Sequence, residues 1–353
     1  MRILQINTEK TWRGGERQTV YTIEGLLDAG VEVGLVCRDN YPLHKSVRDL
    51  PVTIHPARNT ADAVRVTSTV GRTYDLIHAQ SAKGQSIAVL SKPLHNRPIL
   101  YTRRVNFKPH GFSSVLKYNA TDRTVAISTA IRDTLIEFGV RDVEIISSAV
   151  KPRDLDTDRA RNLLESLHVP HDTNIVGWVG DLVPQKDPRL LVETVRELAK
   201  RRQDFVVVQC GNDQMGDKVR AGIENFGLQD RLRLLGHIDG VEDLYALFTV
   251  FLVTGNRTEG LNSSVYDAFA HNVPVVSTLT GGMRDSVADR GLTCPHSDPI
   301  CLADHVSRLL DDAALRASMA DKARQWALDN VTLPAIAKRY LAVYNDMLAR
   351  SSG

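Results

Sequence analysis

The chain has 353 residues, of which 42% are hydrophobic and 24% charged, and its formal net charge is +2. These values are typical of a globular protein and exclude a disordered or collagen-like chain, and the length suits two domains better than one core. No apolar run approaches the roughly 20 residues that span a bilayer. Because the N-terminus enters strand-like sequence directly, we expect no signal peptide and a cytoplasmic location.

The charge and the cysteines narrow the possible partners. Residues 1–150 contain 20 Lys and Arg against 14 Asp and Glu, a net charge of +6, and the remainder contains 24 against 28, a net charge of −4. No nucleic-acid-binding motif occupies the basic half, so we expect no nucleic-acid partner. The four cysteines at positions 37, 210, 294 and 301 lack zinc-site spacing. We expect reduced, mostly buried thiols, with no disulfide and no metal site.

The first half alternates between expected strands and helices. Strands are predicted at residues 1–7, 31–37, 76–80, 99–102 and 123–127. After the first strand, Gly14 and Gly15 lead into a predicted helix over 17–29 with an apolar stripe. A plain tight turn would explain this Gly-Gly pair as well as a functional loop would. For His78, on the third strand, a structural role in the core is favoured over catalysis.

A basic and aromatic segment follows the predicted strand at 99–102. Between Pro98 and Ala120 there are four basic residues and no acidic ones, interleaved with Phe107, Phe112 and Tyr118. One interpretation is a solvated loop. The other is an edge that meets anionic head groups or an anionic acceptor, which places Arg103, Phe107 and Lys108 on the acceptor or membrane side.

The second half has predicted strands at 175–180, 205–209, 232–236, 250–253 and 273–277. Lys186 follows the first of these, and Asp187 and Pro188 begin a predicted helix that extends to Lys200.

The segment over residues 250–277 reads as strand, loop, helix and strand. Glu259 lies just before the helix, which Asn262 or Ser263 can cap, and Ser263 and Asp267 are four residues apart on one helical face. The amides of Gly260, Leu261 and Asn262 at the helix start suit an anion such as a diphosphate. Two carboxylates and a hydroxyl suit a polyhydroxylated ligand, so we predict a sugar-nucleotide site at the carboxyl ends of the strands.

The string from Glu259-Gly260 through Asp267-Ala268-Phe269-Ala270 to Pro274-Val275-Val276 resembles the retaining family 4 glycosyltransferases. Two positions depart from that pattern, because Asp267 replaces the second Glu and Asn272 the usual Gly. The resemblance implies a GT-B fold, with two doubly wound Rossmann-like α/β domains facing a cleft. It makes residues 1–150, with a returning C-terminal helix over 335–353, the acceptor-side domain, and residues 151–334 the domain that binds the nucleotide sugar.

The resemblance also implies roles for individual residues. Lys186 would hold the donor diphosphate, Glu259 the hydroxyls of the donor sugar, and Asp267 those of the ribose. Gly15 would lie near the diphosphate and the acceptor. Further donor-binding positions are implied at Gly180, Gly211, His237, Ile238, Gly260, Leu261, Asn262 and Ser263.

Two positions differ from the family pattern in the charge of their side chains. Asp181 stands where the family has an Arg, which makes Arg257 the candidate second counter-charge. Arg104 stands where many relatives place a His that contacts the donor sugar, and we assign it with Lys186 and Glu259 to the catalytic centre. Its fixed charge suits an acidic group of the acceptor or donor.

The resemblance predicts a retaining, metal-independent glycosyltransferase without a cofactor. It would move a sugar from a nucleotide-diphosphate sugar to a hydroxyl of a cell-surface glycan or lipid-linked acceptor, such as lipopolysaccharide core. The basic segment suggests peripheral contact with the anionic inner face of the cytoplasmic membrane. Two alternatives remain, namely a sugar-nucleotide epimerase of the same fold and a non-catalytic glycan-binding subunit.

Overall fold

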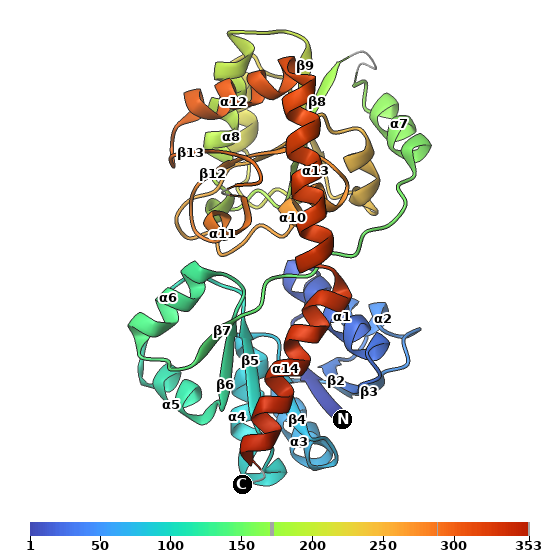
Figure 1. The fold of residues 1–353 in the computed structure, drawn as a ribbon, viewed down its shortest axis with the longest axis vertical. Coiled ribbons are helices and arrows are strands. Elements are labelled where there is room, and N and C mark those ends of the chain that lie inside the picture. The colour runs from blue at the N-terminus through green and yellow to red at the C-terminus, as the bar shows by residue number, and fades with distance from the viewer. Residues whose placement is uncertain (170–172, 288, 352–353) are drawn as a thin grey trace. The chain divides into compact units, whose positions relative to one another are not determined.

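The computed structural model describes residues 1–169, 173–287 and 289–351. The chain divides into two compact units (Figure 1). Unit 1 consists of residues 1–151 together with the C-terminal segment from Asn330, and unit 2 extends from Pro152 to Asp329. Each unit is built around a parallel sheet.

The sheet of unit 1 has seven strands in the order β3-β2-β1-β4-β5-β6-β7. All of its pairs are parallel, and the register places Ile3 opposite Val33 on one side and Leu76 on the other. Strand order therefore reverses between β1 and β4, as in doubly wound folds. The strands are β1 (Arg2–Ile6), β2 (Glu32–Arg38), β3 (Thr53–Ala57), β4 (Leu76–Ala79), β5 (Ile99–Arg103), β6 (Arg123–Ala126) and β7 (Val143–Ile145).

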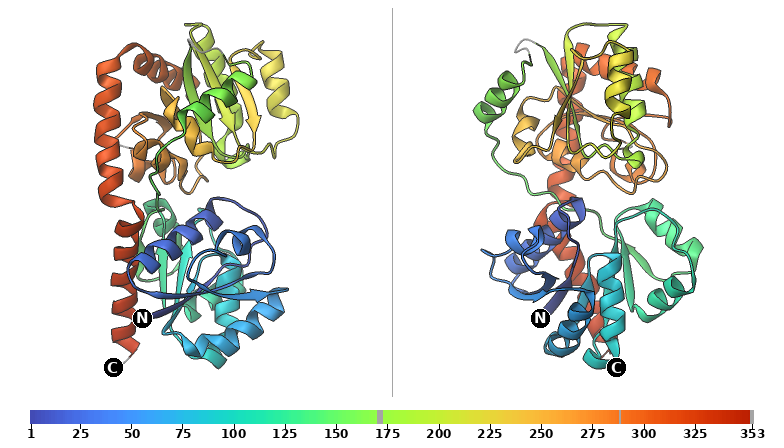
Figure 2. Two further views of the ribbon diagram at one scale, coloured as in Figure 1. Left: turned by 90° about the vertical axis from the view of Figure 1, so that its right-hand side faces the viewer. Right: turned by 180° about the vertical axis from the view of Figure 1, so that it is seen from behind.

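Helices cover both faces of this sheet (Figure 2). They are α1 (Gly14–Asp28), α2 (Pro42–Ser46), α3 (Thr60–Val70), α4 (Ala82–His95), α5 (Phe112–Ala120), α6 (Thr129–Phe138) and α14 (Leu333–Ser351). Helix α1 begins at Gly14, three residues before its predicted start. The reason is a capping box, in which the Glu16 carboxylate accepts a hydrogen bond from the Arg13 amide at 2.9 Å.

The C-terminal helix α14 belongs to unit 1, as predicted, and runs alongside its sheet (Figure 2). Its apolar side chains join the buried cluster that includes Ile3, Ile23 and Leu100. Tyr344 and Tyr340 extend this packing with polar contacts, since the Tyr344 hydroxyl lies 2.8 Å from His78 Nδ1.

Unit 2 has a six-stranded parallel sheet in the order β10-β9-β8-β11-β12-β13. Here the strand order reverses between β8 and β11. The strands are β8 (Asn174–Val179), β9 (Phe205–Cys210), β10 (Leu232–Gly236), β11 (Val250–Val253), β12 (Val275–Thr278) and β13 (Leu292–Cys294). The helices are α7 (Thr157–Ser166), α8 (Pro188–Ala199), α9 (Lys218–Asn225), α10 (Ser264–Ala270), α11 (Met283–Val287), α12 (Pro299–Asp311) and α13 (Ala313–Asn330).

The structure corrects the prediction for two cysteines. Cys294 and Cys301 form a disulfide, with their Cα atoms 5.9 Å apart. Cys294 ends β13 and Cys301 lies in the first turn of α12, so the tertiary packing of these elements sets a distance that the sequence spacing does not reveal. Cys37 and Cys210 are free and buried, as expected. No helix in the described parts of the chain is long and apolar enough to cross a membrane.

Candidate active site

The candidate donor site lies at the carboxyl ends of β8 and β11, the two strands between which the order of the unit 2 sheet reverses. Ligands of doubly wound sheets bind at this position, because the loops of the two adjacent strands diverge there. The loop after β8 carries Lys186, and the loop after β11 carries Glu259. Sequence and topology therefore agree on the location of the site.

The Lys186 side chain lies over the backbone of Gly180, directly after β8. Gly180 has a φ of 150°, and a Cβ there would lie 2.7 Å from Lys186 Cε and 3.0 Å from its Nζ. A side chain at position 180 would therefore displace the lysine. Within the described part of the chain, the Lys186 ammonium forms no ion pair, so its charge is available to a ligand.

Two side chains tie the Glu259 loop to the Lys186 loop. Thr254 Oγ1 donates to the Lys186 carbonyl at 2.8 Å and accepts from the Trp178 indole at 3.0 Å. Asn256 Nδ2 donates to the Pro184 carbonyl at 2.7 Å, and its backbone amide donates to the Gln185 carbonyl at 2.9 Å. The two functional loops are therefore fixed relative to each other inside unit 2.

Glu259 lies on the loop that Thr254 and Asn256 tie to the Lys186 loop. Its amide donates to the Asn256 carbonyl at 3.1 Å, and its side chain is partly buried. Its carboxylate has no hydrogen-bond or ion-pair partner among the described residues. A partly buried carboxylate without a protein partner is costly unless a ligand or water binds it, so Glu259 fits the predicted contact with sugar hydroxyls.

The loop after β12 packs against the backbone of the Glu259 loop. A Cβ at Gly281 would lie 1.9 Å from the Glu259 carbonyl oxygen, and one at Gly282 would lie 1.9 Å from that of Gly260. As a result Gly260 and Asn262 are buried, and Leu261 is partly exposed. The predicted contact of the Gly260, Leu261 and Asn262 amides with a diphosphate stays a prediction.

The start of α10 is otherwise arranged as expected. The Asn262 carboxamide oxygen accepts a hydrogen bond from the Ser264 amide at 3.2 Å. Asn262, and not the Ser263 side chain, therefore caps the start of α10. Ser263 is partly exposed, and Asp267 is only 4% exposed, one turn further along the helix. Burial lowers the pKa of the neighbouring His271, and the Asp267 carboxylate partly offsets this effect.

Asp181, the departure from the family arginine, organises the loop after β9. Its carboxylate accepts from the Asn212 amide at 2.9 Å and from Gln214 Nε2 at 2.9 Å. Gly211 is needed beside it, since its φ is 142° and a Cβ there would lie 2.1 Å from the Gly180 carbonyl oxygen. Asp181 thus has a structural contact that the sequence did not reveal.

His237 and Ile238 follow β10, which β9 and β8 separate from β11 in the sheet order. His237 is exposed, and its Nε2 lies 3.2 Å from a carboxylate oxygen of Asp239. Arg257 is exposed in the loop after β11. These three residues are accessible, as a contact with a nucleotide requires.

Sequence reasoning missed the residues that hold the loops in place. Thr254 and Asn256 were missed, as were Thr278 and Thr280, whose hydroxyls donate to the Gly255 carbonyl at 3.0 and 3.1 Å. Small polar residues directly after buried strands are the available signal, because they sit where exposed loop carbonyls need donors.

Unit 1 carries its own candidate site at the carboxyl ends of β1, β4 and β5. The Arg104 guanidinium donates to the Gln80 side-chain oxygen, and its Cδ would lie 3.9 Å from a Cβ at Gly15 in the first turn of α1. The buried Arg104 Nε has no hydrogen-bond partner among the described residues. A guanidinium with an unused donor beside a helix start suits an anionic group.

His78 is structural in this unit. It is fully buried, and its two ring nitrogens lie 2.8 Å from the Tyr344 and Thr102 hydroxyls. Burial, with a smaller contribution from the Arg104 charge, lowers its pKa well below the ordinary value. The predicted core role of His78 is therefore confirmed.

Two family models divide the chain between them in a way that follows the two units. Residues 12–154 match "Glycosyltransferase Family 4", and residues 160–326 match "Glycosyl transferases group 1". Each half of the chain therefore matches a glycosyltransferase family model. The first match holds Gly15 and Arg104, and the second holds Lys186 and Glu259.

Curated relatives share this family at moderate identity. The D-inositol 3-phosphate glycosyltransferase of Corynebacterium glutamicum is 29% identical over 60% of this chain and 51% of its own length. The enzyme of the same name from Salinispora tropica is 27% identical over 82% of this chain and 66% of its own length. The chain thus spans about half to two thirds of the length of these relatives.

A solved structure supports the fold. Anabaena HepE, crystallised in complex with UDP and glucose, has a TM-score of 0.84 and 19% identity, with 98% of this chain and 100% of that chain covered. Together with the two parallel sheets, this likeness shows that the chain has the GT-B α/β fold.

The predicted acceptor and membrane edge of unit 1 needs one correction. Arg103 is only 4% exposed, and its guanidinium donates to the Tyr118 hydroxyl at 2.8 Å and to the Val105 and Phe107 carbonyls. It therefore shapes the loop from inside and does not present its charge at the surface. The reason is that these carbonyls and the buried Tyr118 hydroxyl need a donor.

Phe107 and Lys108, which this loop presents, are exposed as predicted. Phe107 is 59% exposed and Phe112 is 75% exposed, and Val115 and Leu116 extend the apolar surface along one side of α5. We call Phe107, Lys108, Phe112, Val115 and Leu116 the α5 patch.

Proposed function

We propose that the chain is a retaining glycosyltransferase that takes a sugar from a nucleotide-diphosphate donor bound in unit 2. The observation that carries the proposal is the arrangement of Lys186 and Glu259. Their charged groups lack protein partners among the described residues, and Thr254 and Asn256 clamp their loops together at the point where strand order reverses.

The donor's diphosphate would bind Lys186, with Arg257 as the second counter-charge, because a leaving diphosphate needs positive potential where its charge develops. Glu259 would bind hydroxyls of the donor sugar, and Asp267 those of the ribose. His237 and Ile238 would lie near the base. Configuration at the anomeric carbon would be retained, with the leaving phosphate oxygen accepting the proton of the acceptor hydroxyl and no metal ion taking part.

The acceptor would carry an anionic group. The proposal is supported by Arg104, which is partly exposed and carries a fixed positive charge, and by Gly15 beside it at the start of α1. Relatives named for a phosphorylated acceptor, D-inositol 3-phosphate, point in the same direction. A cell-surface glycan or a lipid-linked acceptor with phosphate or carboxylate groups would satisfy the same chemistry.

Contact with an anionic membrane surface would follow from the α5 patch. Exposed aromatic and aliphatic side chains beside a lysine are typical of helices that lie in the head-group region. A lipid-linked acceptor would then reach the protein from that surface.

The test is a transfer assay with UDP-, GDP- and ADP-sugars and a panel of phosphorylated and unphosphorylated acceptors, in which NMR follows the anomeric configuration. We expect transfer with retention, persistence of the activity in EDTA, and loss of about two to three orders of magnitude in rate for Glu259→Gln. Arg104→Gln should raise KM for a phosphorylated acceptor selectively.

Other outcomes would contradict the proposal. Conversion of the sugar nucleotide without any acceptor would indicate an epimerase, and nucleotide-sugar binding without turnover would indicate a glycan-binding subunit. Donor affinity that is unchanged in Arg257→Ala would remove Arg257 from the diphosphate site.

A further inference from the structure

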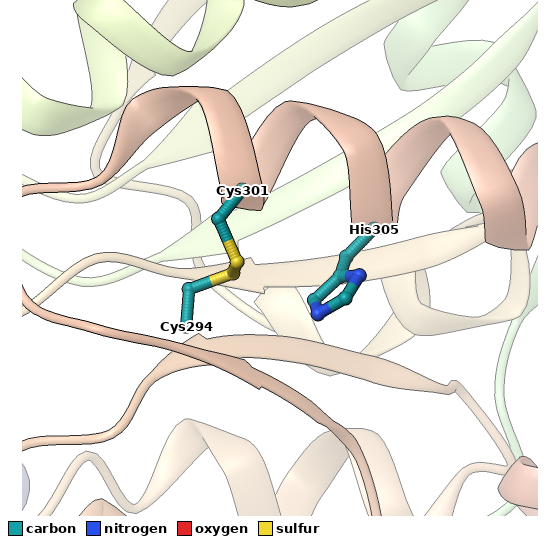
Figure 3. Close-up of side chains that lie close together, drawn as sticks. All are labelled: Cys294, Cys301 and His305. Carbon is teal, nitrogen blue, oxygen red and sulfur yellow. A yellow bond between two sulfur atoms is a disulfide. The ribbon is translucent and has the colours of Figure 1, made fainter.

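The disulfide of unit 2 lies beside a histidine. Cys294 ends β13, Cys301 is the third residue of α12, and His305 follows one turn later on the same helix (Figure 3). The two sulfur atoms and a ring nitrogen lie within 4.8 Å of one another.

We propose that Cys294 and Cys301 are a reversible redox pair that low-molecular-weight disulfides oxidise, and that the state of the pair alters donor binding. Cys301 is the attacking thiol and Cys294 the resolving one. The effect on the donor rests on the proposed function, whereas the thiol chemistry does not.

The surroundings of the two cysteines assign these roles. Cys301 is partly exposed and lies in the first turn of a 13-residue helix, where the helix dipole favours a thiolate. His305 is four residues further along the same face, and one of its ring nitrogens lies within 4.8 Å of both sulfur atoms. Cys294 is 1% exposed, and its sulfur contacts that of Cys301.

The remaining cysteines provide a contrast inside the chain. Burial raises the pKa of both Cys37 and Cys210 to about 12, with a smaller contribution from Asp39 at Cys37. Such thiols are inert toward disulfides at neutral pH, because the thiolate is the nucleophile. Only the pair on β13 and α12 is therefore placed to react.

The reaction balances with one oxidised reagent. The Cys301 thiolate attacks a disulfide RSSR, forms a mixed disulfide and releases RS⁻, which takes up the proton lost from Cys301. Cys294 then loses its proton and attacks the Cys301 sulfur, which forms the intramolecular disulfide and releases the second RSH. Two protein thiols are oxidised, and one RSSR is reduced to two RSH.

The bonded pair closes the loop that connects β13 to α12, and this loop touches the donor site. His296 Nε2 lies 3.6 Å from a carboxylate oxygen of Asp187, which caps α8 and directly follows Lys186. The Cys294 carbonyl accepts from the Leu279 amide at 2.8 Å, next to the threonines that hold the Gly255 carbonyl. Opening the disulfide would release a loop with contacts to both donor-site segments.

A zinc centre made of the same three residues is less favoured. Structural zinc takes four protein ligands, and the group contains three among the described residues. The two sulfur atoms are moreover bonded to each other in the structure.

The thiol test uses the full chain, reduced with dithiothreitol, transferred to buffer and treated with oxidised glutathione. Alkylation and mass spectrometry should show the 294–301 disulfide in the wild type. Cys294→Ser should stop at the mixed disulfide on Cys301, Cys301→Ser should not react, and Cys37→Ala should behave like the wild type. His305→Asn should slow mixed-disulfide formation severalfold.

The donor test compares binding of UDP, GDP and ADP to the oxidised and reduced wild type by calorimetry. Binding should be severalfold weaker after reduction, and Cys294→Ser should match the reduced wild type in both conditions. Absence of any disulfide, or stoichiometric zinc release when the thiols are alkylated, would overturn the redox pair. Equal affinity in both states would overturn its effect on the donor, whereas nucleotide binding in neither state would count against the proposed function alone.

Discussion

At the scale of single residues, the charge at position 181 distinguishes this chain from the pattern it resembles. Asp181 follows Gly180, over which Lys186 lies, and its carboxylate holds the loop after β9 through Asn212 and Gln214. The negative charge of Asp181 would repel a bound diphosphate, whereas its hydrogen bonds stabilise the loop. The two effects can be separated with one isosteric substitution.

Asp181→Asn keeps an acceptor for the loop amides and removes the charge. We expect a nucleoside diphosphate to bind about two- to threefold more tightly, as for one screened repulsive charge, and the free energy of unfolding to fall by about 1 kcal/mol. Calorimetric titration and denaturant unfolding measure the two quantities, with Asp213→Asn as the matched control. Weaker nucleotide binding would instead make Asp181 a donor ligand.

At the scale of elements, the sequence predicts buried strands well and tertiary contacts poorly. The strand Val250–Val253 and the core residues Val265 and Phe269 follow directly from apolar runs and helical spacing. The edge strand β13 has only three residues and no clear period, so neither it nor the disulfide at its end was predicted. Arg103 shows the same limit, since its burial depends on where Tyr118 lies.

The contacts by which Thr254 joins the Lys186 loop to the Glu259 loop can be tested by substitution. Thr254→Val keeps the shape and leaves the Trp178 indole and the Lys186 carbonyl without this partner, which should cost about 2–3 kcal/mol of unfolding free energy. Because the Lys186 loop loses an anchor, KM for the donor should rise as well. Denaturant unfolding and steady-state kinetics measure the two effects.

Thr194→Val is the matched control for Thr254→Val. Thr194 is equally buried, and its hydroxyl donates to the Leu190 carbonyl within α8. This variant should lose stability without a change in donor KM. If both variants left donor KM unchanged, the Thr254 contacts would have no role in positioning Lys186.

At the scale of the whole molecule, buried histidines set the pH dependence of stability. Burial is the largest cause of the lowered pKa values of His55, His78, His95 and His271, each relative to 6.5. The unfolded chain therefore binds more protons than the folded chain below about pH 6.5, and the free energy of unfolding decreases as the pH is lowered. Burial also raises the pKa of the Glu16 carboxyl, and this one group has the opposite effect on the pH dependence of stability.

We expect Tm to fall as the pH is lowered from 7 to 5. His78→Gln should reduce the number of protons taken up on unfolding by up to about one. Thermal unfolding across this range, with the exposed His110→Gln as control, provides the measurement. A Tm that stayed constant or rose on acidification would contradict this account of the buried histidines.

The proposed function requires unit 2 to bind a nucleoside diphosphate through the loop after β8. The most direct measurement is calorimetric titration of UDP, GDP and ADP against the wild type, Lys186→Ala and Lys200→Ala, the last at the opposite end of α8. The account predicts that one nucleotide binds the wild type and Lys200→Ala alike and binds Lys186→Ala at least about tenfold more weakly, the loss of one charge-assisted contact. Equal affinity for all three proteins, or no binding of any nucleotide, would contradict it.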